Sequence, residues 1–233
     1  NTIEEIHQSK IDNFNIDIMH GLPNQTVEEA IFDISEAIVM KPTHISWYQL
    51  TIEPNTWFFR YPPKLPDDDL ASEMQFEIES VVHEHGYAQY EVSAFAKPGR
   101  QCLHNTNYWE FGDYLGIGAG AHSKITTSQS VTRIVKHKQP KRYMEAVSLG
   151  SGLYSNQIVA SESLPFEFFM NALRLNAGVP RGLFEKRTAL PIDLVNSKLM
   201  VLERRGLMDL SDGFIRTTPL GMRFLNEVLQ EFL

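Results

Sequence analysis

One short segment of the chain, CLHNTNYWEFGDYLGIGAGAH, gathers residue types that could bind a flat ligand. It contains His104, Asn105, Tyr108 and Trp109 in the pattern H-N-x-x-Y-W. An imidazole offers a nitrogen to a metal, and aromatic neighbours offer apolar faces to a planar ring system. These four residues are candidates for an aromatic or metallated ligand, with His104 as the candidate metal ligand. The alternative is that the two aromatic residues are core and that His104 and Asn105 cap a local turn.

Asp17 is a second candidate, because it lies near the end of the apolar run FNIDIMH, which a Gly-Leu-Pro turn follows. Open α/β sheets and barrels bind ligands at the carboxyl ends of their parallel strands. A carboxylate is an acceptor for two hydroxyl protons, which suits a ribose diol. The alternative is that Asp17 caps the turn. His20, three residues further on, is interpreted as a polar residue at the strand end rather than as a ligand.

Glycines and the single cysteine of the same region were weighed as binding residues. Gly116, Gly118 and Gly120 are spaced G-x-G-x-G, which differs from the dinucleotide-binding pattern G-x-G-x-x-G. We expect residues 114–123 to form a strand in which the glycines allow close approach of backbone or ligand. Cys102 has no second cysteine for a disulfide or an all-cysteine metal site, and it is interpreted as a bystander.

Alternating strand and helix patterns predict the elements that must position these residues. Apolar, β-branched runs predict strands at 14–20, 44–52 and 87–96. Apolar residues at helical spacing predict helices at 24–41 and 68–86. Strand, helix and strand with short connections form a βαβ unit, so we expect neighbouring strands to be parallel and the helices to cover one face.

The pattern changes after residue 125. A strand is expected at 130–137, a helix at 140–150 and a linker at 151–161. From residue 163 onward, helical segments, a hairpin around SDG and a closing helix at 219–233 predict a winged-helix-like α+β domain. The predicted organisation is an α/β part at 1–125, a connecting segment at 126–160 and a small C-terminal domain at 161–233.

The composition is that of an ordinary globular chain of 233 residues. A net charge of −8 argues against a general electrostatic attraction to nucleic acid or anionic membrane. The longest basic run, at 133–142, is interpreted as a solvated loop and helix start. No apolar run approaches the roughly 18 residues of a membrane span, and no signal segment opens the chain. We therefore expect a cytoplasmic protein without a nucleic-acid partner.

Several segments, in order, resemble one known family. They are NIDIMHGLPNQT, PTHISWYQLTIEPNT, LPDDD, YEVSAFAKPG, HNTNYW and YLGIGAGAHS. Together they look like the HemW haem chaperones, a family of radical S-adenosylmethionine proteins related to oxygen-independent coproporphyrinogen III oxidase. The resemblance runs from about Phe14 to His122, and the later segment PFEFFMNALRL resembles the family as well.

The resemblance implies a fold and a set of ligands. The fold is a partial, TIM-like (β/α)6 barrel with a helical C-terminal domain, and the ligands are S-adenosylmethionine, a [4Fe-4S] cluster and haem. Asp17 matches the carboxylate that contacts the ribose of S-adenosylmethionine. His104, Asn105, Tyr108 and Trp109 match the haem-associated motif. The implied function is to hold haem and deliver it to acceptor haemoproteins, which could include membrane-associated ones. An open half-barrel would expose strand edges, which favours pairing into a homodimer.

The chain also departs from the family. The cluster requires a Cys-x3-Cys-x2-Cys loop, whereas this chain has Cys102 alone. The chain is therefore expected to match the C-terminal part of such a protein and to lack the cluster ligands. Since reductive cleavage of S-adenosylmethionine needs an electron from the cluster, we expect no radical chemistry from the chain by itself.

Two further functions were weighed against the haem chaperone. The first is oxygen-independent coproporphyrinogen III oxidase, but HNTNYW favours the chaperone branch because the oxidase branch is expected to lack this motif. The second is DNA binding by the winged-helix-like tail. The tail has no dense basic helix, since only Arg204 and Arg205 stand together, so this function is disfavoured.

Overall fold

The computed structural model describes residues 2–233, and the chain divides into two compact units. The N-terminal unit ends at Cys102, and the C-terminal unit begins at Leu103. Among the described residues, no helix combines the length and the apolar character needed to cross a membrane.

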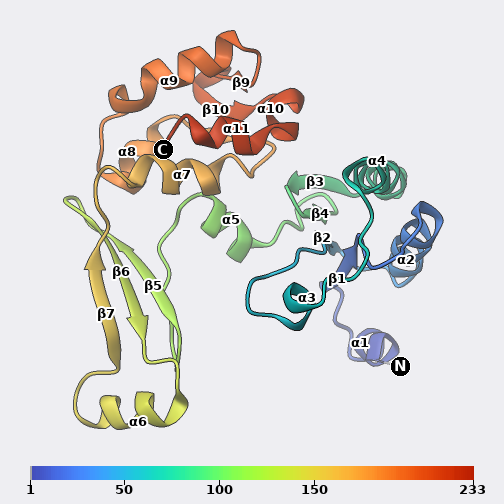
Figure 1. Ribbon diagram of the computed structural model, residues 1–233, viewed down its shortest axis with the longest axis horizontal. Helices are drawn as coiled ribbons and strands as arrows, with labels where there is room; N and C mark the ends of the chain where they lie inside the picture. Colours follow the sequence, from blue (N-terminus) through green and yellow to red (C-terminus); the bar gives the residue numbers. More distant parts are fainter. Residues whose placement is uncertain (1) are drawn as a thin grey trace. The chain divides into compact units, whose positions relative to one another are not determined.

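The N-terminal unit is a mixed sheet with helices packed against it (Figure 1). Its helices are α1 (Thr2–Gln8), α2 (Val27–Val39), α3 (Trp57–Arg60) and α4 (Asp68–Glu84). Its strands are β1 (Asn15–His20), β2 (His44–Gln49), β3 (Ala88–Glu91) and β4 (Ala94–Ala96), in the order β1-β2-β4-β3. The strands β1 and β2 are parallel, which confirms the predicted βαβ unit.

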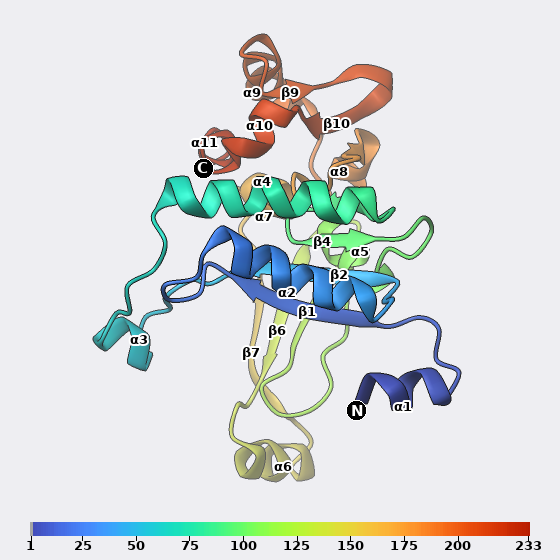
Figure 2. The same cartoon turned by 90° about the vertical axis from the view of Figure 1, so that its right-hand side faces the viewer.

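Local sequence explains the two long helices. Thr26 and Glu29 form a capping box at the start of α2, and Asp67 accepts a hydrogen bond from the backbone N–H of Leu70 at the start of α4. Both helices bury one apolar stripe against the sheet, and Figure 2 shows them lying side by side. The stripes pack with the apolar face of the sheet, and the buried cluster is Ala30, Ile34, Ile45, Trp47, Met74, Ile78, Val82, Tyr87 and Phe95.

The strand expected at 87–96 is two strands. The strands β3 and β4 are antiparallel to each other, and β4 is antiparallel to β2. The expectation that the strand after α4 would pair in parallel is therefore wrong. The chain reverses after Glu91, whose carboxylate accepts a hydrogen bond from the backbone N–H of Ser93. A register shift between Gln89 and Glu91 accompanies this reversal.

The C-terminal unit contains two three-stranded sheets (Figure 1). Its helices are α5 (Leu103–Trp109), α6 (Pro140–Ser148), α7 (Leu164–Ala172), α8 (Gly182–Thr188), α9 (Asp193–Arg204), α10 (Pro219–Arg223) and α11 (Leu225–Gln230). Its strands are β5 (His122–Thr126), β6 (Val131–Lys136), β7 (Leu153–Ile158), β8 (Val179–Pro180), β9 (Met208–Asp209) and β10 (Phe214–Thr217).

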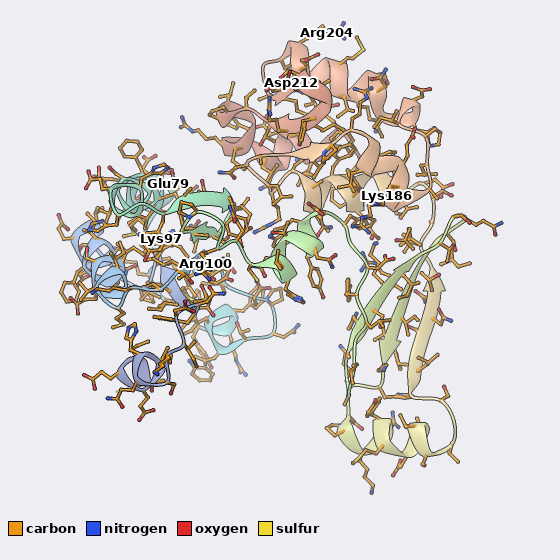
Figure 3. The ribbon with its side chains drawn as sticks, turned by 180° about the vertical axis from the view of Figure 1, so that it is seen from behind. Glu79, Lys97, Arg100, Lys186, Arg204 and Asp212 are labelled. Carbon is orange, nitrogen blue, oxygen red and sulfur yellow. The ribbon has the colours of Figure 1, made fainter. Side chains whose placement is uncertain are left out.

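The tail has the predicted helices and hairpin around an aromatic core. Phe168, Phe169, Phe184 and Phe232 pack ring against ring. The hairpin strands β9 and β10 are joined by the 3-10 turn Ser211–Gly213, and β8 pairs with β10 as a third strand. Figure 3 shows Asp212 in this turn, Lys186 on α8 and Arg204 at the end of α9.

Three expectations for the C-terminal unit are wrong. The linker expected at 151–161 contains strand β7, which pairs with β6. The strand expected at 114–123 is a loop as far as Ala121, because Gly118 and Gly120 have positive φ angles of 99° and 72°. The closing helix is broken into α10 and α11 at Phe224, whose φ and ψ of −110° and 34° are not helical.

Candidate functional site

Helix α5 presents the histidine of the H-N-x-x-Y-W motif to solvent. His104 and Tyr108 are four residues apart and lie on the same face of the helix, with ring centroids 4.9 Å apart at an interplanar angle of 62°. His104 is exposed, and its ring nitrogens make no hydrogen bond to the described residues. Its imidazole is therefore available to an external metal.

Tyr108 is fixed from behind by a second tyrosine. Its ring stacks on that of Tyr114, with 4.5 Å between the centroids and 27° between the planes. Burial raises the pKa of the Tyr108 phenol above its ordinary value, and the neighbouring Tyr114 phenol raises it further. Tyr108 is therefore neutral at physiological pH and serves as an apolar ring with one hydroxyl group.

Trp109 points in another direction. It is five positions from His104, which on a helix is about 140° around the axis from it. The Arg174 guanidinium lies 4.3 Å from the centroid of its ring, a cation–π contact within the C-terminal unit. The indole Nε1 is buried and has no hydrogen-bond partner among the described residues. Asn105 is half-buried on the same helix. The motif is thus divided between the exposed His104 with the half-buried Tyr108 and a tryptophan whose indole nitrogen is buried.

A buried lysine holds the chain just after α5. Lys124 Nζ donates to the carbonyl oxygen of Phe111 at 2.9 Å, to Asp113 Oδ1 at 3.0 Å and to Thr126 Oγ1 at 2.9 Å. The same ammonium lies 4.1 Å from the centroid of the Phe111 ring. The lysine therefore ties β5 to the turn through which the chain leaves α5.

Lys124 and Asp113 each shift the pKa of the other. Burial lowers the pKa of Lys124, and the hydrogen bonds and charge of Asp113 oppose that effect. Partial burial acts to raise the pKa of Asp113, but hydrogen bonds from Thr126 and Lys124 outweigh it and hold the pKa below its ordinary value. The pair is an ion pair in which both side chains also have neutral partners, as a buried pair requires.

Exposed apolar side chains stand near His104 and Tyr108 in the sequence. Leu103 precedes His104, and Leu115 and Ile117 follow Tyr114 in the glycine-rich loop, where they are 76% and 89% exposed. Side chains of this kind are usually buried, so a group of them beside a free imidazole marks a binding surface. Sequence reasoning missed these residues, although their alternation with glycines in YLGIGAG was a usable signal.

Asp17 lies on the sheet of the N-terminal unit and heads a polar network. Asn15 Nδ2 donates to Asp17 Oδ1 at 2.6 Å, and Asn15 Oδ1 accepts from His44 Nδ1 at 2.6 Å and from Ser46 Oγ at 3.1 Å. The network continues to Tyr90, whose hydroxyl donates to His44 Nε2 at 2.8 Å. Asp17 itself is exposed.

The pairing of β1 with β2 explains why these residues meet. Asn15 is opposite His44 and Asp17 is opposite Ser46 in a parallel register, so all four share one face of the sheet. Burial lowers the pKa of His44, and the charge of Asp17 partly offsets this. His44 is therefore a neutral link that orients Asn15, and Asn15 orients the carboxylate. None of the three partners was predicted as a site residue.

His20 is the last residue of β1, the strand end at which it was expected, and it is buried there. It is 2% exposed and stacks on Trp47, with 4.7 Å between the ring centroids and 8° between the planes. Burial lowers its pKa to about 4. A histidine covered in this way is not accessible to a metal.

The described residues do not fit a [4Fe-4S] cluster. Such a cluster is held by several cysteine thiolates, and the chain has one cysteine, Cys102, which forms no disulfide. No group of three or more histidine, cysteine, aspartate or glutamate side chains in the described part could hold a metal ion. The arrangement at α5 fits a planar metallated ligand instead, because it combines one free imidazole with aromatic and aliphatic surfaces.

The chain is similar to known proteins along nearly its whole length. The family described as "HemN C-terminal domain" matches residues 159–224. "Heme chaperone HemW" of Haemophilus influenzae is 47% identical over 227 residues, which cover 97% of this chain and 58% of that protein. "Heme chaperone HemW" of Escherichia coli is 45% identical over 221 residues, covering 94% of this chain and 57% of that protein. The chain thus spans less than two thirds of the length of these relatives.

A solved structure has the same fold. The structure described as "Coproporphyrinogen III oxidase (HemN) from Escherichia coli is a Radical SAM enzyme" matches 99% of this chain and 57% of its own chain, with a TM-score of 0.75. The sequence identity is 20%, so this likeness shows the fold alone. The mixed α/β architecture of the chain is thus shared with that structure.

Proposed function

We propose that this chain, a relative of the HemW haem chaperones along nearly its whole length, binds haem on α5 as part of a protein that delivers it. The observation that supports this most directly is the exposed His104 imidazole, free of hydrogen bonds to described residues, beside the ring of Tyr108. Haem is the cargo of such a protein, so the site has to bind it and release it.

The residues of the C-terminal unit divide this work between them. A nitrogen of His104 would ligate the haem iron, because a neutral imidazole is the usual protein ligand of haem iron. Tyr108 and the exposed Leu103, Leu115 and Ile117 would contact the apolar porphyrin. Lys124 would keep the end of α5 and the following loop in place through its three hydrogen bonds. Asn105 and Trp109 complete the motif from the half-buried side of α5.

An exposed site suits transfer. Each of the apolar residues at the site stands on a helix start or a loop rather than in a closed pocket. Burial of the porphyrin on one side only would give moderate affinity, since affinity from apolar contact grows with the area removed from water. An acceptor haemoprotein with an enclosed pocket would then take the haem. We propose such haemoproteins as the partners of the full protein.

The cofactors of the radical S-adenosylmethionine family belong to the same proposal. Asp17, oriented by Asn15, would accept hydrogen bonds from the ribose hydroxyls of S-adenosylmethionine. That cofactor supplies radical chemistry only with an electron from the cluster, for which the described residues offer no ligand set. The residues described here therefore support binding roles and no redox step.

The observations favour the chaperone over the oxidase. The relatives at 45% and 47% identity are named haem chaperones, whereas the likeness to coproporphyrinogen III oxidase is at 20% identity and concerns the fold. The alternative predicts that a full-length, cluster-loaded protein converts coproporphyrinogen III to protoporphyrinogen. A haem-binding protein that forms no such product supports the first function.

The deciding experiment is a haem titration followed by the Soret absorbance. We compare the wild-type chain with His104→Ala and with His122→Ala, a matched change at another exposed histidine. Loss of the iron ligand should weaken haem binding at least tenfold, about 1.4 kcal/mol, in His104→Ala only. Equal affinities of the wild type and His104→Ala would overturn the role of His104. Light scattering of the same samples tests the predicted homodimer.

A further inference from the structure

A hollow lies in the C-terminal unit, at the end of the β5-β6-β7 sheet where α6 joins β6 to β7. Figure 1 shows α6 at this end of the sheet. Its volume is about 280 Å³. It is lined by two cationic side chains, a histidine, an amide and a phenol, namely Lys138, Arg142, His137, Gln139 and Tyr154. Figure 1 shows α5 at the opposite end of the sheet. The glycine-rich loop that follows α5 reaches the end with the hollow, where the Gly120 N–H donates to the His137 carbonyl.

The cations of this hollow have no acidic partner. Among the described residues, neither Lys138 nor Arg142 forms an ion pair, and no lining residue is acidic. Two other cations of the unit are paired with carboxylates, Lys124 with Asp113 and Arg216 with Asp209, whereas Lys138 and Arg142 are exposed to solvent. Segment 131–158 contains five lysine and arginine residues and one glutamate, in a chain of net charge −8. The two exposed charges are therefore available to an anion from solution.

One wall of the hollow is aromatic and in part open. Tyr154 is 71% exposed, and the His137 ring meets its ring edge-on with 5.7 Å between the centroids and 72° between the planes. The backbone of His137 is fixed on both sides, because its carbonyl accepts from Gly120 N–H at 2.8 Å and its N–H donates to the Gly152 carbonyl at 3.3 Å. Because Tyr154 is largely exposed, its ring is accessible to a flat ligand.

We propose that this hollow binds a small phosphorylated ligand with a flat ring, of the nucleotide class. Lys138 and Arg142 would hold the phosphate through charge-assisted hydrogen bonds, with Gln139 as an additional donor. The face of Tyr154 would stack on the ring. The volume is at the small end of ligand pockets, which suits one mononucleotide and excludes burial of a porphyrin.

The test is calorimetric titration of the whole chain with AMP, adenosine and ribose 5-phosphate. AMP should bind saturably, ribose 5-phosphate more weakly and adenosine without measurable affinity. Arg142→Gln should weaken AMP binding at least fivefold, and Tyr154→Ala should weaken AMP but not ribose 5-phosphate. Lys141→Gln is the matched control, since Lys141 is the exposed neighbour of Arg142 and does not line the hollow.

Three results would overturn the proposal. They are absence of saturable AMP binding at millimolar concentration, equal losses in Arg142→Gln and Lys141→Gln, and equal affinities for AMP and ribose 5-phosphate. The first removes the site, the second reduces it to general electrostatic attraction, and the third removes the role of Tyr154. His104→Ala should leave AMP binding unchanged, so failure of the haem proposal and failure of this one are distinguishable.

Discussion

Two histidines of this chain stand beside aromatic residues and have opposite environments. His20, in the N-terminal unit, is sealed against Trp47, and burial lowers its pKa to about 4. His104, in the C-terminal unit, lies open to solvent beside Tyr108. Each lies within four residues of a turn or an aromatic residue in the sequence. The difference shows that neighbouring residue types can suggest a histidine as a metal ligand, whereas its exposure determines whether a metal can reach it.

The two surroundings also differ in how they are held in place. His20 stacks on Trp47, which belongs to an apolar core cluster with Ile45 and Phe95. The chain after α5 is held by polar contacts, because the Lys124 ammonium donates hydrogen bonds to Phe111, Asp113 and Thr126. A polar anchor fixes geometry while it leaves the outer face of the helix free of packing, which an exposed binding site requires.

The largest expected effect is a difference in stability between the same substitution at His20 and at His104. His20→Lys buries an ammonium without a partner and should lower the free energy of unfolding by about 3 kcal/mol or more. His104→Lys replaces one exposed side chain with another and should change it by less than about 0.5 kcal/mol. Hydrogen exchange of the β1 and α5 amides, measured in urea, reports the two units separately. Similar losses of unfolding free energy in the two variants would contradict the difference in burial between His20 and His104.

Removal of the polar anchor should have the next largest effect. Lys124→Met keeps the length of the side chain but leaves Asp113 and the Phe111 carbonyl without their donor. We expect a loss of about 2 to 3 kcal/mol of unfolding free energy, because an unsatisfied buried acceptor retains its full desolvation cost. Lys141→Met, at an exposed lysine, is the control and should change little. Haem binding should weaken in Lys124→Met alone, and an unchanged haem affinity would separate the anchor from the site.

Lowering the pH should reduce the unfolding free energy of the N-terminal unit by a smaller amount. The pKa of His20 is about 4 in the folded chain and about 6.5 when unfolded, so between these values the unfolded state binds more protons. The stability of the N-terminal unit should therefore fall as the pH drops through this window, by roughly 1 kcal/mol between pH 7.5 and 5.5. His20→Leu should flatten this slope in urea titrations. A slope identical to that of the wild type would place the acid sensitivity elsewhere.

The elements that depend on local sequence could be predicted. The Thr26 capping box and the apolar stripe of α2 lie within one short segment, and the parallel pairing of β1 and β2 follows from the helix between them. The β3–β4 reversal was missed because it uses a bulge and the Glu91 side chain rather than a glycine or proline. Strand β7 was missed because its side chains are mostly polar or exposed, so alternation gave no signal.

The part of the candidate site that depends on local sequence could also be predicted. The i, i+4 relation of His104 and Tyr108 follows from helix geometry, and the motif letters suffice for it. The partners of the motif come from distant positions: Arg174 is 65 residues beyond Trp109, and Lys124 reaches back to Phe111 from β5. Contacts at such separations depend on the folded chain, so one sequence without homologues could not supply them.

The smallest expected effect tests whether the exposed apolar side chains belong to the site. Ile117→Ser removes an apolar side chain that is 89% exposed, so the unfolding free energy should change by less than about 0.5 kcal/mol. If that side chain contacts the porphyrin, haem affinity should fall about threefold to tenfold, as expected for the loss of one partly buried aliphatic group. Ile158→Ser, at an exposed isoleucine on β7, is the matched control and should leave haem binding unchanged. Equal haem affinities of the wild type and Ile117→Ser would confine the site to α5, and the exposure of the loop would then have no part in haem binding.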